Sequence, residues 1–145
     1  MQAVTIKPVL VRAKYLPQVV SFKFGAEGSS TTSTSYVTIA DSDIALDMSD
    51  YRGPNGKLYL KFIAHIYNDS SGETTYVRIY RQNAGTAVSD TELSGTGAGW
   101  TIAESDWVDM SNESGDESYQ IQMKVTGGTG MYNSAIMILS PYKLW

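Results

Sequence analysis

Apolar and polar residues alternate with a period of two over most of this chain, and this alternation is the feature that most constrains its fold. The longest example, 57–68, reads KLYLKFIAHIYN, which places Leu58, Leu60, Phe62, Ala64 and Ile66 on one face. Successive side chains of a β-strand point to opposite faces of a sheet, so this segment predicts a strand with one buried face. No segment repeats apolar residues at the spacing of an amphipathic helix.

The same alternation recurs in short segments that are separated by loops rich in Gly, Ser, Asn and Asp. The segments are 3–13, 18–24, 35–40, 57–68, 74–82, 86–93, 100–110, 118–126 and 133–145. Short strands at this spacing predict an all-β fold. We expect an antiparallel two-sheet β-sandwich of about eight strands, jelly-roll-like, with an N-terminal β-arm or edge strand.

The N-terminal segment differs from the rest of the chain in charge. Lys7, Arg12, Lys14 and Lys23 occur before residue 26 without any acid, whereas the whole chain has a formal net charge of −4. Pro8 and Pro17 each remove a backbone donor, which suits an edge strand or an arm. We therefore predict two parts: a basic arm or edge-strand segment, 1–25, and a single sandwich domain, 26–145.

Composition and motifs exclude several functions. The acidic body lacks the clustered Lys and Arg that nucleic-acid binding needs. No apolar run reaches the roughly 18 residues of a membrane span, and the N-terminus lacks an apolar core of signal-peptide length. GTGAGW and GPNGKL each miss required positions of a nucleotide-binding loop. We expect no signal peptide, no membrane contact and no nucleic acid bound by the body.

Candidate catalytic and metal sites are equally weak. His65 is the single histidine, it falls on the polar face of its strand, and the chain has no cysteine. Nucleophilic triads and the usual zinc sites are therefore not available. Acids are frequent enough that chance pairs are inevitable, so they do not by themselves indicate a glycosidase. We predict no enzyme activity, no catalytic residues and no cofactor; DSDIALD (41–47) leaves a structural calcium ion as a weak alternative.

A glycine-rich loop, GGTG at 127–130, separates two of the apolar strands. Glycine supplies the positive φ angles of tight connections, so we interpret the loop as a β-hairpin between 118–126 and 133–139. A short uncharged tip can approach another backbone closely. Gly127, Gly128 and Gly130 are therefore a candidate contact in an assembly.

The polar faces of 57–68 and 74–82 form the candidate interaction surface. If the two strands pair through the NDSSGE loop, their outer faces combine into one surface. Tyr and Arg are typical of protein interfaces, although cross-strand Tyr pairs can also serve only to stabilise a sheet. The residues are Tyr59, Lys61, His65, Tyr67, Tyr76, Arg78 and Tyr80.

A weak internal repeat relates SDIALDMSD (42–50) to SDWVDMSN (105–112). Each copy precedes a loop and then a strand that contains Tyr. We interpret both as the same kind of corner, with Asp and Ser bonded to nearby backbone and with Met48 and Met110 pointing inward.

The order of the parts from 30 to 140 resembles a known group of modules. TSTSYVTI opens the pattern; an A-x-x-Y-N strand, the VRIYRQNAGTAV segment, a W-T strand and YQIQMK follow in order. These features are similar to jelly-roll modules in structural proteins of tailed phages and other prokaryotic viruses. Residues 1–25 lie outside the pattern.

The resemblance implies a non-enzymatic virion structural protein that acts through self-association and contacts with other virion proteins. Capsid decoration, coat, tail and fibre roles all remain open, and the expected location is the virion. The alternative is a carbohydrate- or receptor-binding β-sandwich with a surface glycan as partner. For assembly, the basic residues Lys7, Arg12 and Lys14 are the candidate arm, since an arm added to a sheet edge binds through backbone hydrogen bonds.

Overall fold

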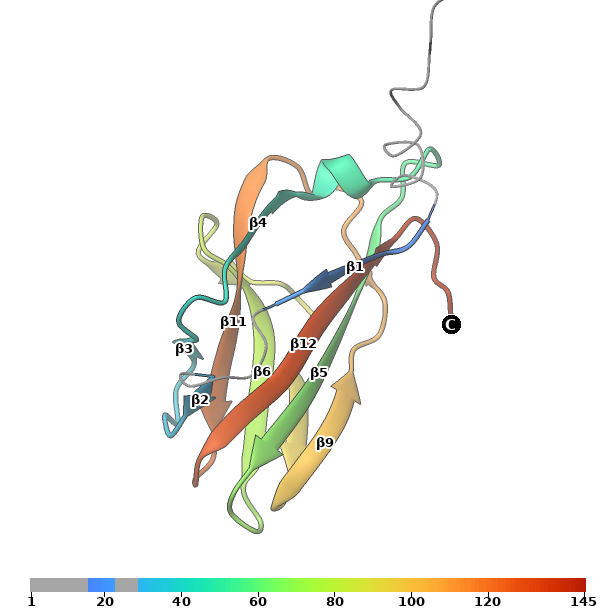
Figure 1. Cartoon of the computed structure of the whole chain (residues 1–145). Coiled ribbons are helices and arrows are strands. Elements are labelled where there is room, and N and C mark those ends of the chain that lie inside the picture. Colours follow the sequence, from blue (N-terminus) through green and yellow to red (C-terminus); the bar gives the residue numbers. More distant parts are fainter. Residues whose placement is uncertain (1–15, 23–28) are drawn as a thin grey trace, which may run out of the picture.

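The computed structural model describes residues 16–22 and 29–145, which fold into two antiparallel β-sheets packed face to face (Figure 1). The sheets hold twelve strand segments: β1 Gln18–Ser21, β2 Ser30–Thr31, β3 Val37–Thr38, β4 Ile44–Asp47, β5 Tyr59–Asn68, β6 Thr74–Arg81, β7 Thr86–Ala87, β8 Leu93–Thr96, β9 Gly99–Glu104, β10 Val108–Asp109, β11 Asp116–Val125 and β12 Gly130–Ser140. The helical content of the described residues is one short 3-10 turn, Met48–Tyr51.

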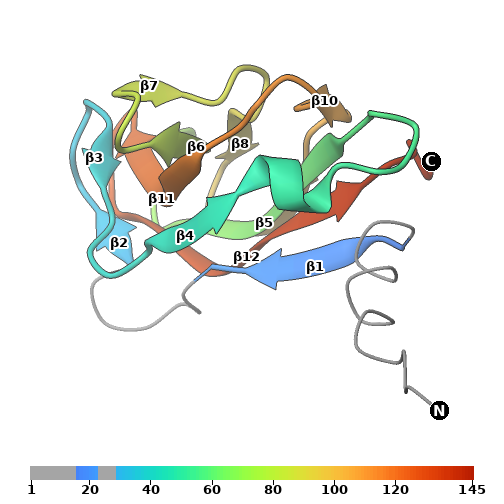
Figure 2. The ribbon, with the colours of Figure 1, turned by 90° about the horizontal axis from the view of Figure 1, so that it is seen from above.

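Each sheet has two long central strands flanked by an interrupted strand on either side. Sheet A is centred on β12 and β5, with β1 and β2 beside β12 and with β9 and β10 beside β5. Sheet B is centred on β11 and β6, with β3 and β4 beside β11 and with β7 and β8 beside β6. When each interrupted strand is counted once, the fold is an eight-stranded jelly roll, which confirms the predicted fold class. Figure 2 shows the two layers from above.

The core lies between the inner faces of the sheets and matches the alternation in the sequence. Leu58, Leu60, Phe62, Ala64 and Ile66 are all buried in it. The other sheet contributes Val77, Ile79, Tyr119, Ile121 and Met123. The predicted core face of 57–68 is therefore confirmed.

Buried hydroxyl groups replace missing strand contacts where three of the flanking strands are interrupted. The Ser105 hydroxyl accepts from the Phe62 N–H at 2.9 Å, at the break between β9 and β10. Ser42 accepts from Ile121 N–H at 3.0 Å between β3 and β4, and Thr91 accepts from Ile79 N–H at 3.2 Å between β7 and β8. A buried N–H without an acceptor is costly, so these hydroxyls allow the strands to break without leaving the central strands unsatisfied.

The internal repeat corresponds to two of these corners. After Ser42 the Asp47 carboxylate accepts from Ser49 N–H, and after Ser105 the Asp109 carboxylate accepts from Ser111 N–H, both at 2.9 Å. Met48 and Met110 are buried. The corner interpretation of SDIALDMSD and SDWVDMSN is confirmed.

Two expected pairings are wrong. β5 and β6 lie in opposite sheets, and so do β11 and β12. The NDSSGE loop and the GGTG loop are therefore connections that cross from one sheet to the other, not β-hairpins. The 86–93 and 100–110 segments are also not continuous strands, because each is interrupted at the hydroxyl-bearing breaks described above.

The N-terminal part of the described chain is an edge strand. Gln18–Ser21 pairs antiparallel with Leu139–Ile136 of β12. The predicted arm residues Lys7, Arg12 and Lys14 lie outside the described residues, and the division at residue 25 stays a prediction.

Candidate interaction surfaces

The outer face of sheet A carries an exposed aromatic and apolar patch. On β5 and β9, Tyr67 lies opposite Trp100 and His65 lies opposite Ile102. The Trp100 ring is 4.6 Å from the His65 ring and 5.0 Å from the Tyr67 ring, centroid to centroid. Trp100 is nevertheless 47% exposed and Ile102 is 73% exposed. We call these four residues the aromatic patch.

The outward direction of Trp100 and Ile102 is set by the opposite strand β8. A Cβ atom on Gly95 would lie 3.1 Å from the Thr101 Cβ and 3.2 Å from Ile66 side-chain carbons. Thr101 lies at this close approach and Ala103 packs against the core, so these two small residues take the inner face of β9. The large side chains at positions 100 and 102 therefore point to the outside.

The C-terminal tail covers the neighbouring part of the same face. Lys61 is only 4% exposed, and its ammonium group lies 3.7 Å from Glu104 Oε1. The same group lies 5.5 Å from the centre of the Trp107 ring and 5.3 Å from the Trp145 ring. Trp107 Nε1–H donates to the Trp145 carbonyl at 2.9 Å. Lys61 thus anchors the tail by cation–π contacts and is not accessible to a partner.

The outer face of sheet B is polar and internally bonded. The Arg78 guanidinium lies 3.7 Å from the centre of the Tyr36 ring and donates twice to Gln122 Oε1, at 2.9 and 2.8 Å. The Tyr36 hydroxyl donates to Glu92. Burial, together with this bond to the carboxylate, raises the pKa of Tyr36 well above its usual value. Lys124 lies over the rings of Tyr36 and Tyr76.

The predicted single interaction surface is therefore divided between two faces. Tyr59, Lys61, His65 and Tyr67 belong to sheet A, whereas Tyr76, Arg78 and Tyr80 belong to sheet B. The error follows from the crossing of the NDSSGE loop between sheets. Of the two groups, the sheet A residues adjoin exposed apolar side chains, and the sheet B residues are held in contacts within their own sheet. Binding by either group stays a prediction.

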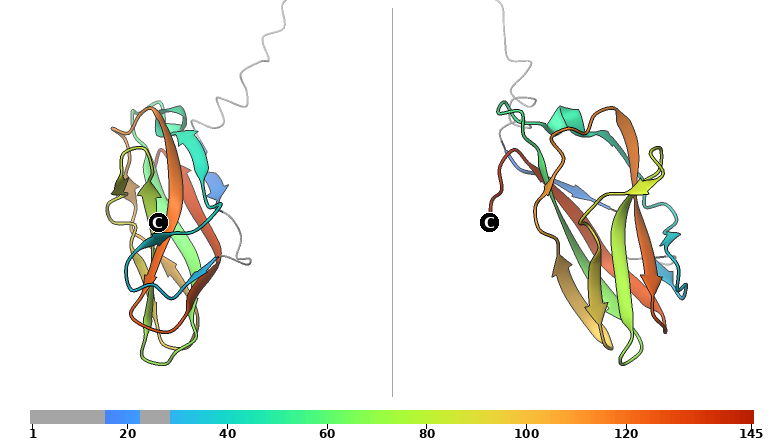
Figure 3. Two further views of the ribbon diagram at one scale, coloured as in Figure 1. Left: turned by 90° about the vertical axis from the view of Figure 1, so that its left-hand side faces the viewer. Right: turned by 180° about the vertical axis from the view of Figure 1, so that it is seen from behind.

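A groove of about 820 Å³ opens along one side of the sandwich, between the β7–β8 region and the β9–β10 region. Figure 3 shows the strands of the two sheets from the side and from behind. Its walls carry the carboxylates of Asp90, Glu92, Glu104 and Asp106 together with the Trp107 ring. Glu92 accepts from Tyr36, and Glu104 pairs with Lys61. The groove is thus acidic, with one aromatic wall.

The glycine-rich loop contacts its own chain. A Cβ on Gly128 would lie 2.5 Å from Ser70 Oγ, and one on Gly127 would lie 2.7 Å from the Glu73 carboxyl carbon. A Cβ on Gly130 would lie 2.6 Å from Thr75 Oγ1. The Asp69 carboxylate also accepts from Thr129 N–H at 2.7 Å. The glycines therefore allow the two crossing loops to pack on each other, and this intramolecular role explains them without an assembly contact.

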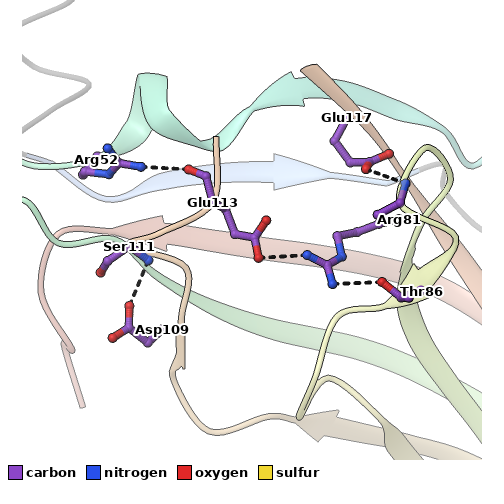
Figure 4. A network of polar contacts seen from close by, with 8 residues as sticks. Arg52, Arg81, Thr86, Asp109, Ser111, Glu113 and Glu117 are labelled. Carbon is purple, nitrogen blue, oxygen red and sulfur yellow. Dashed lines mark hydrogen bonds and ion pairs between the residues drawn. The ribbon is translucent and has the colours of Figure 1, made fainter. Parts of the chain in front are cut away.

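At the opposite end, a charged network holds loops together (Figure 4). Arg81 donates to Glu113 Oε1 at 2.8 Å and to Thr86 Oγ1 at 2.9 Å, while Arg52 donates to the Glu113 carbonyl at 2.8 Å. Burial raises the pKa of the nearby Tyr119 to about 12, with the Glu113 and Glu117 carboxylates adding to the shift. Arg52, Arg81, Thr86 and Glu113 are joined by these bonds within the chain, so the network is structural.

Across 16–22 and 29–145, no three His, Cys, Asp or Glu side chains gather as a metal-binding group. Within DSDIALD, Asp43 accepts from Gln120 Nε2–H at 3.1 Å and Asp47 accepts from Ser49, so these carboxylates serve different partners. Among the same residues no helix is long and apolar enough to cross a membrane.

Several solved structures share the fold of this chain at low sequence identity. A protein of the infectious bursal disease virus Gx strain superposes with a TM-score of 0.53 and 11% identity, over 89% of this chain and 33% of that one. The VP2 subviral particle of the same virus superposes with a TM-score of 0.52 and 10% identity, over 97% of this chain and 37% of the other. A carbohydrate-binding module from Cellvibrio mixtus lichenase 5A superposes with a TM-score of only 0.40 and 11% identity, over 83% of this chain and 85% of that module.

This chain therefore spans about a third of the length of the virus proteins that it matches. At such low identity the likeness shows the fold alone. It supports the jelly-roll part of the resemblance and does not distinguish tailed phages from other viruses. No family model and no curated protein matches the sequence.

Proposed function

We propose that this chain is a non-enzymatic structural component of a virus particle that acts through self-association. The observation that carries the proposal is the aromatic patch. Trp100 and Ile102 are the most prominent apolar side chains that β9 presents to solvent, and they lie beside Tyr67 and His65 on the outer face of sheet A. A contiguous exposed apolar surface with polar surroundings is typical of a protein–protein contact.

The shared fold supports the same proposal. The neighbours of similar fold are proteins of a virus and of its subviral particle, which supports a structural role in a particle for this chain. The pattern of the sequence from 30 to 140 favours a prokaryotic virus, and a coat, decoration or tail position within the virion. The basic residues Lys7, Arg12 and Lys14 complement the acidic body, which supports an additional contact between the N-terminal segment and a neighbouring copy.

Self-association can be tested directly with the full chain. Sedimentation velocity over a concentration series should show discrete species larger than the 15.9 kDa monomer at micromolar concentration, and electron microscopy should show them as closed or regular assemblies. A chain that stays monomeric throughout the series, alone and with other proteins of the same particle, would contradict the proposal.

A second candidate function is carbohydrate binding, and the exposed Trp100 ring is the observation that favours it. An open aromatic face beside hydroxyl and imidazole groups can hold the apolar face of a sugar ring. A glycan array with the full chain tests this function. Saturable binding that Trp100→Ala abolishes and Val37→Thr leaves intact would support it, and absence of signal would remove it.

A further inference from the structure

The open edge of β9 points to a specific pairing between two copies of this chain. Sheet A ends at β9, which pairs with β5 on one side and with no strand of the described chain on the other. Figure 1 shows β9 as the outermost strand of its layer. Unpaired backbone N–H and C=O groups on such an edge are a template for another strand.

The backbone groups that face outward can be assigned from the ladder. Ser105 N–H donates to the Phe62 carbonyl at 2.9 Å, one residue beyond the Ile63–Glu104 pair at the end of the ladder, so Phe62 lies opposite Ser105. Hydrogen-bonded and non-hydrogen-bonded pairs alternate in an antiparallel ladder. Residues 101 and 103 therefore bond to β5, whereas the N–H and C=O groups of Trp100, Ile102 and Glu104 point to the open edge.

This edge lacks the features that usually prevent pairing. β9 has six residues and contains no proline and no lysine, and its only charged residue is Glu104. The other flanking strands have two to four residues each. Ile102 is 73% exposed at the middle of β9. The longest edge is thus also the least protected.

We infer that β9 pairs antiparallel with β9 of a second copy about a two-fold axis at Ile102. The outward groups of one β9 are complementary to those of another under a two-fold rotation, so the same edge serves as both partners. β9 ends at Glu104, so a two-fold axis at Ile102 gives 100–104 as the paired residues. Ile102 then lies opposite Ile102 of the second copy, and Trp100 lies opposite Glu104, with no like charges facing each other.

The inference rests on the self-association proposed above and makes it specific. Pairing would join the two A sheets into one continuous sheet and would bring the two aromatic patches side by side on its outer face. The unit that assembles further would be this two-fold dimer.

Cysteine crosslinking in the full chain tests the register, because the chain has no cysteine of its own. A hydrogen-bonded antiparallel pair has Cα atoms about 5.5 Å apart, within the range of a disulfide. Ile102→Cys alone should form a disulfide-linked dimer under mild oxidation. Trp100→Cys alone and Glu104→Cys alone should not form this dimer. In the proposed register each of these positions is four residues along the strand from the same position in the second copy, a distance of about 13 Å. A mixture of these two variants should form the heterodimer.

Val37→Cys on sheet B is the matched control, since Val37 is also an exposed apolar strand residue. Dimer yield for Ile102→Cys no higher than for Val37→Cys, or equal yield at 100, 102 and 104, would overturn the pairing. If the unsubstituted protein still self-associates in sedimentation while Ile102→Cys fails to crosslink, the pairing is wrong and the proposed function stands. If the unsubstituted protein is monomeric and no variant crosslinks above the control, both are wrong.

Discussion

Replacing Ile102 by threonine tests whether the exposed side of β9 is an assembly surface. Threonine keeps the β-branch that favours a strand, so the change removes apolar surface with little effect on the backbone. Complete burial of an isoleucine is worth about 1.5–3 kcal/mol, and Ile102 is 73% exposed in the single chain, so roughly 1–2 kcal/mol is available on association.

In a two-fold contact the residue counts twice. Threonine retains part of the apolar surface, so we expect the free energy of dimer association to weaken by about 1.5–3 kcal/mol. The dimer dissociation constant should then rise roughly 10- to 150-fold. The free energy of unfolding of the monomer should change by less than about 0.5 kcal/mol, because the side chain makes few contacts within the chain. Sedimentation equilibrium measures the first quantity, and urea denaturation measures the second.

Val37→Thr removes the same kind of side chain from the other sheet and should leave association unchanged. If Ile102→Thr associates as tightly as the unsubstituted chain, the reasoning from exposed area on β9 is refuted. It is equally refuted if Val37→Thr weakens association by the same factor, since the loss would then not be local to β9.

Four further predictions follow from other parts of the molecule. Gly128→Ala should destabilise the fold more than Gly72→Ala in urea denaturation: both sites have positive φ, which costs about 1–2 kcal/mol, but only at position 128 would the Cβ meet oxygens at 2.5–2.7 Å. Ser105→Ala should cost about 1–3 kcal/mol by leaving the buried Phe62 N–H without an acceptor, whereas the exposed Ser94→Ala should cost little. Deletion of 1–16 should leave a folded body with unchanged circular dichroism that no longer assembles in light scattering; normal assembly would contradict the arm. The pKa of Asp69 is lowered, first by its bond from Thr129, so its contribution to stability is present above about pH 4 and is lost as pH falls through the folded pKa; Asp69→Asn should flatten thermal stability against pH in this range.

The fold class and the core were predictable because alternation is a local property. Within 57–68 the alternation of neighbouring residues is sufficient to identify the apolar face, and this face is buried in the structure. The buried Met48 and Met110 corners were predictable for a similar reason, because the repeated segments 42–50 and 105–112 are also local features. Local patterning states which face of a strand is apolar, and that is sufficient for a sandwich.

The pairing of strands was not predictable from the same information. A five-residue loop such as 69–73 can close a hairpin or cross between sheets, and the alternation of β5 and β6 fits both. In this jelly roll the 69–73 loop and the GGTG loop both cross from one sheet to the other. His65 and Arg78 therefore lie on opposite faces of the molecule. The prediction of one combined interaction surface was wrong for this reason, and not because its residues are buried as a group.

His65 and Tyr67 of the aromatic patch were predicted, but Trp100 and Ile102 were missed because hydrophobicity alone points these two side chains inward. Their direction depends on a contact from another sheet, where Gly95 leaves space only for small residues on the inner face of β9. The signal in the sequence was the small pair Thr101 and Ala103 between large neighbours. It becomes informative only once β8 is known to lie against β9.

The edges of the two sheets show how the same chain limits some contacts and leaves one open. At three breaks a buried hydroxyl satisfies the central strand and shortens the flanking one, so most edges offer too few consecutive backbone groups for a partner strand. The break at Ser105 also fixes where β9 ends, and Gly99 fixes where it begins. Between them lies the longest flanking strand, with Ile102 at its centre. A protein that only had to stay monomeric would gain from a lysine or proline at this position, so the exposed isoleucine is best explained by a partner strand.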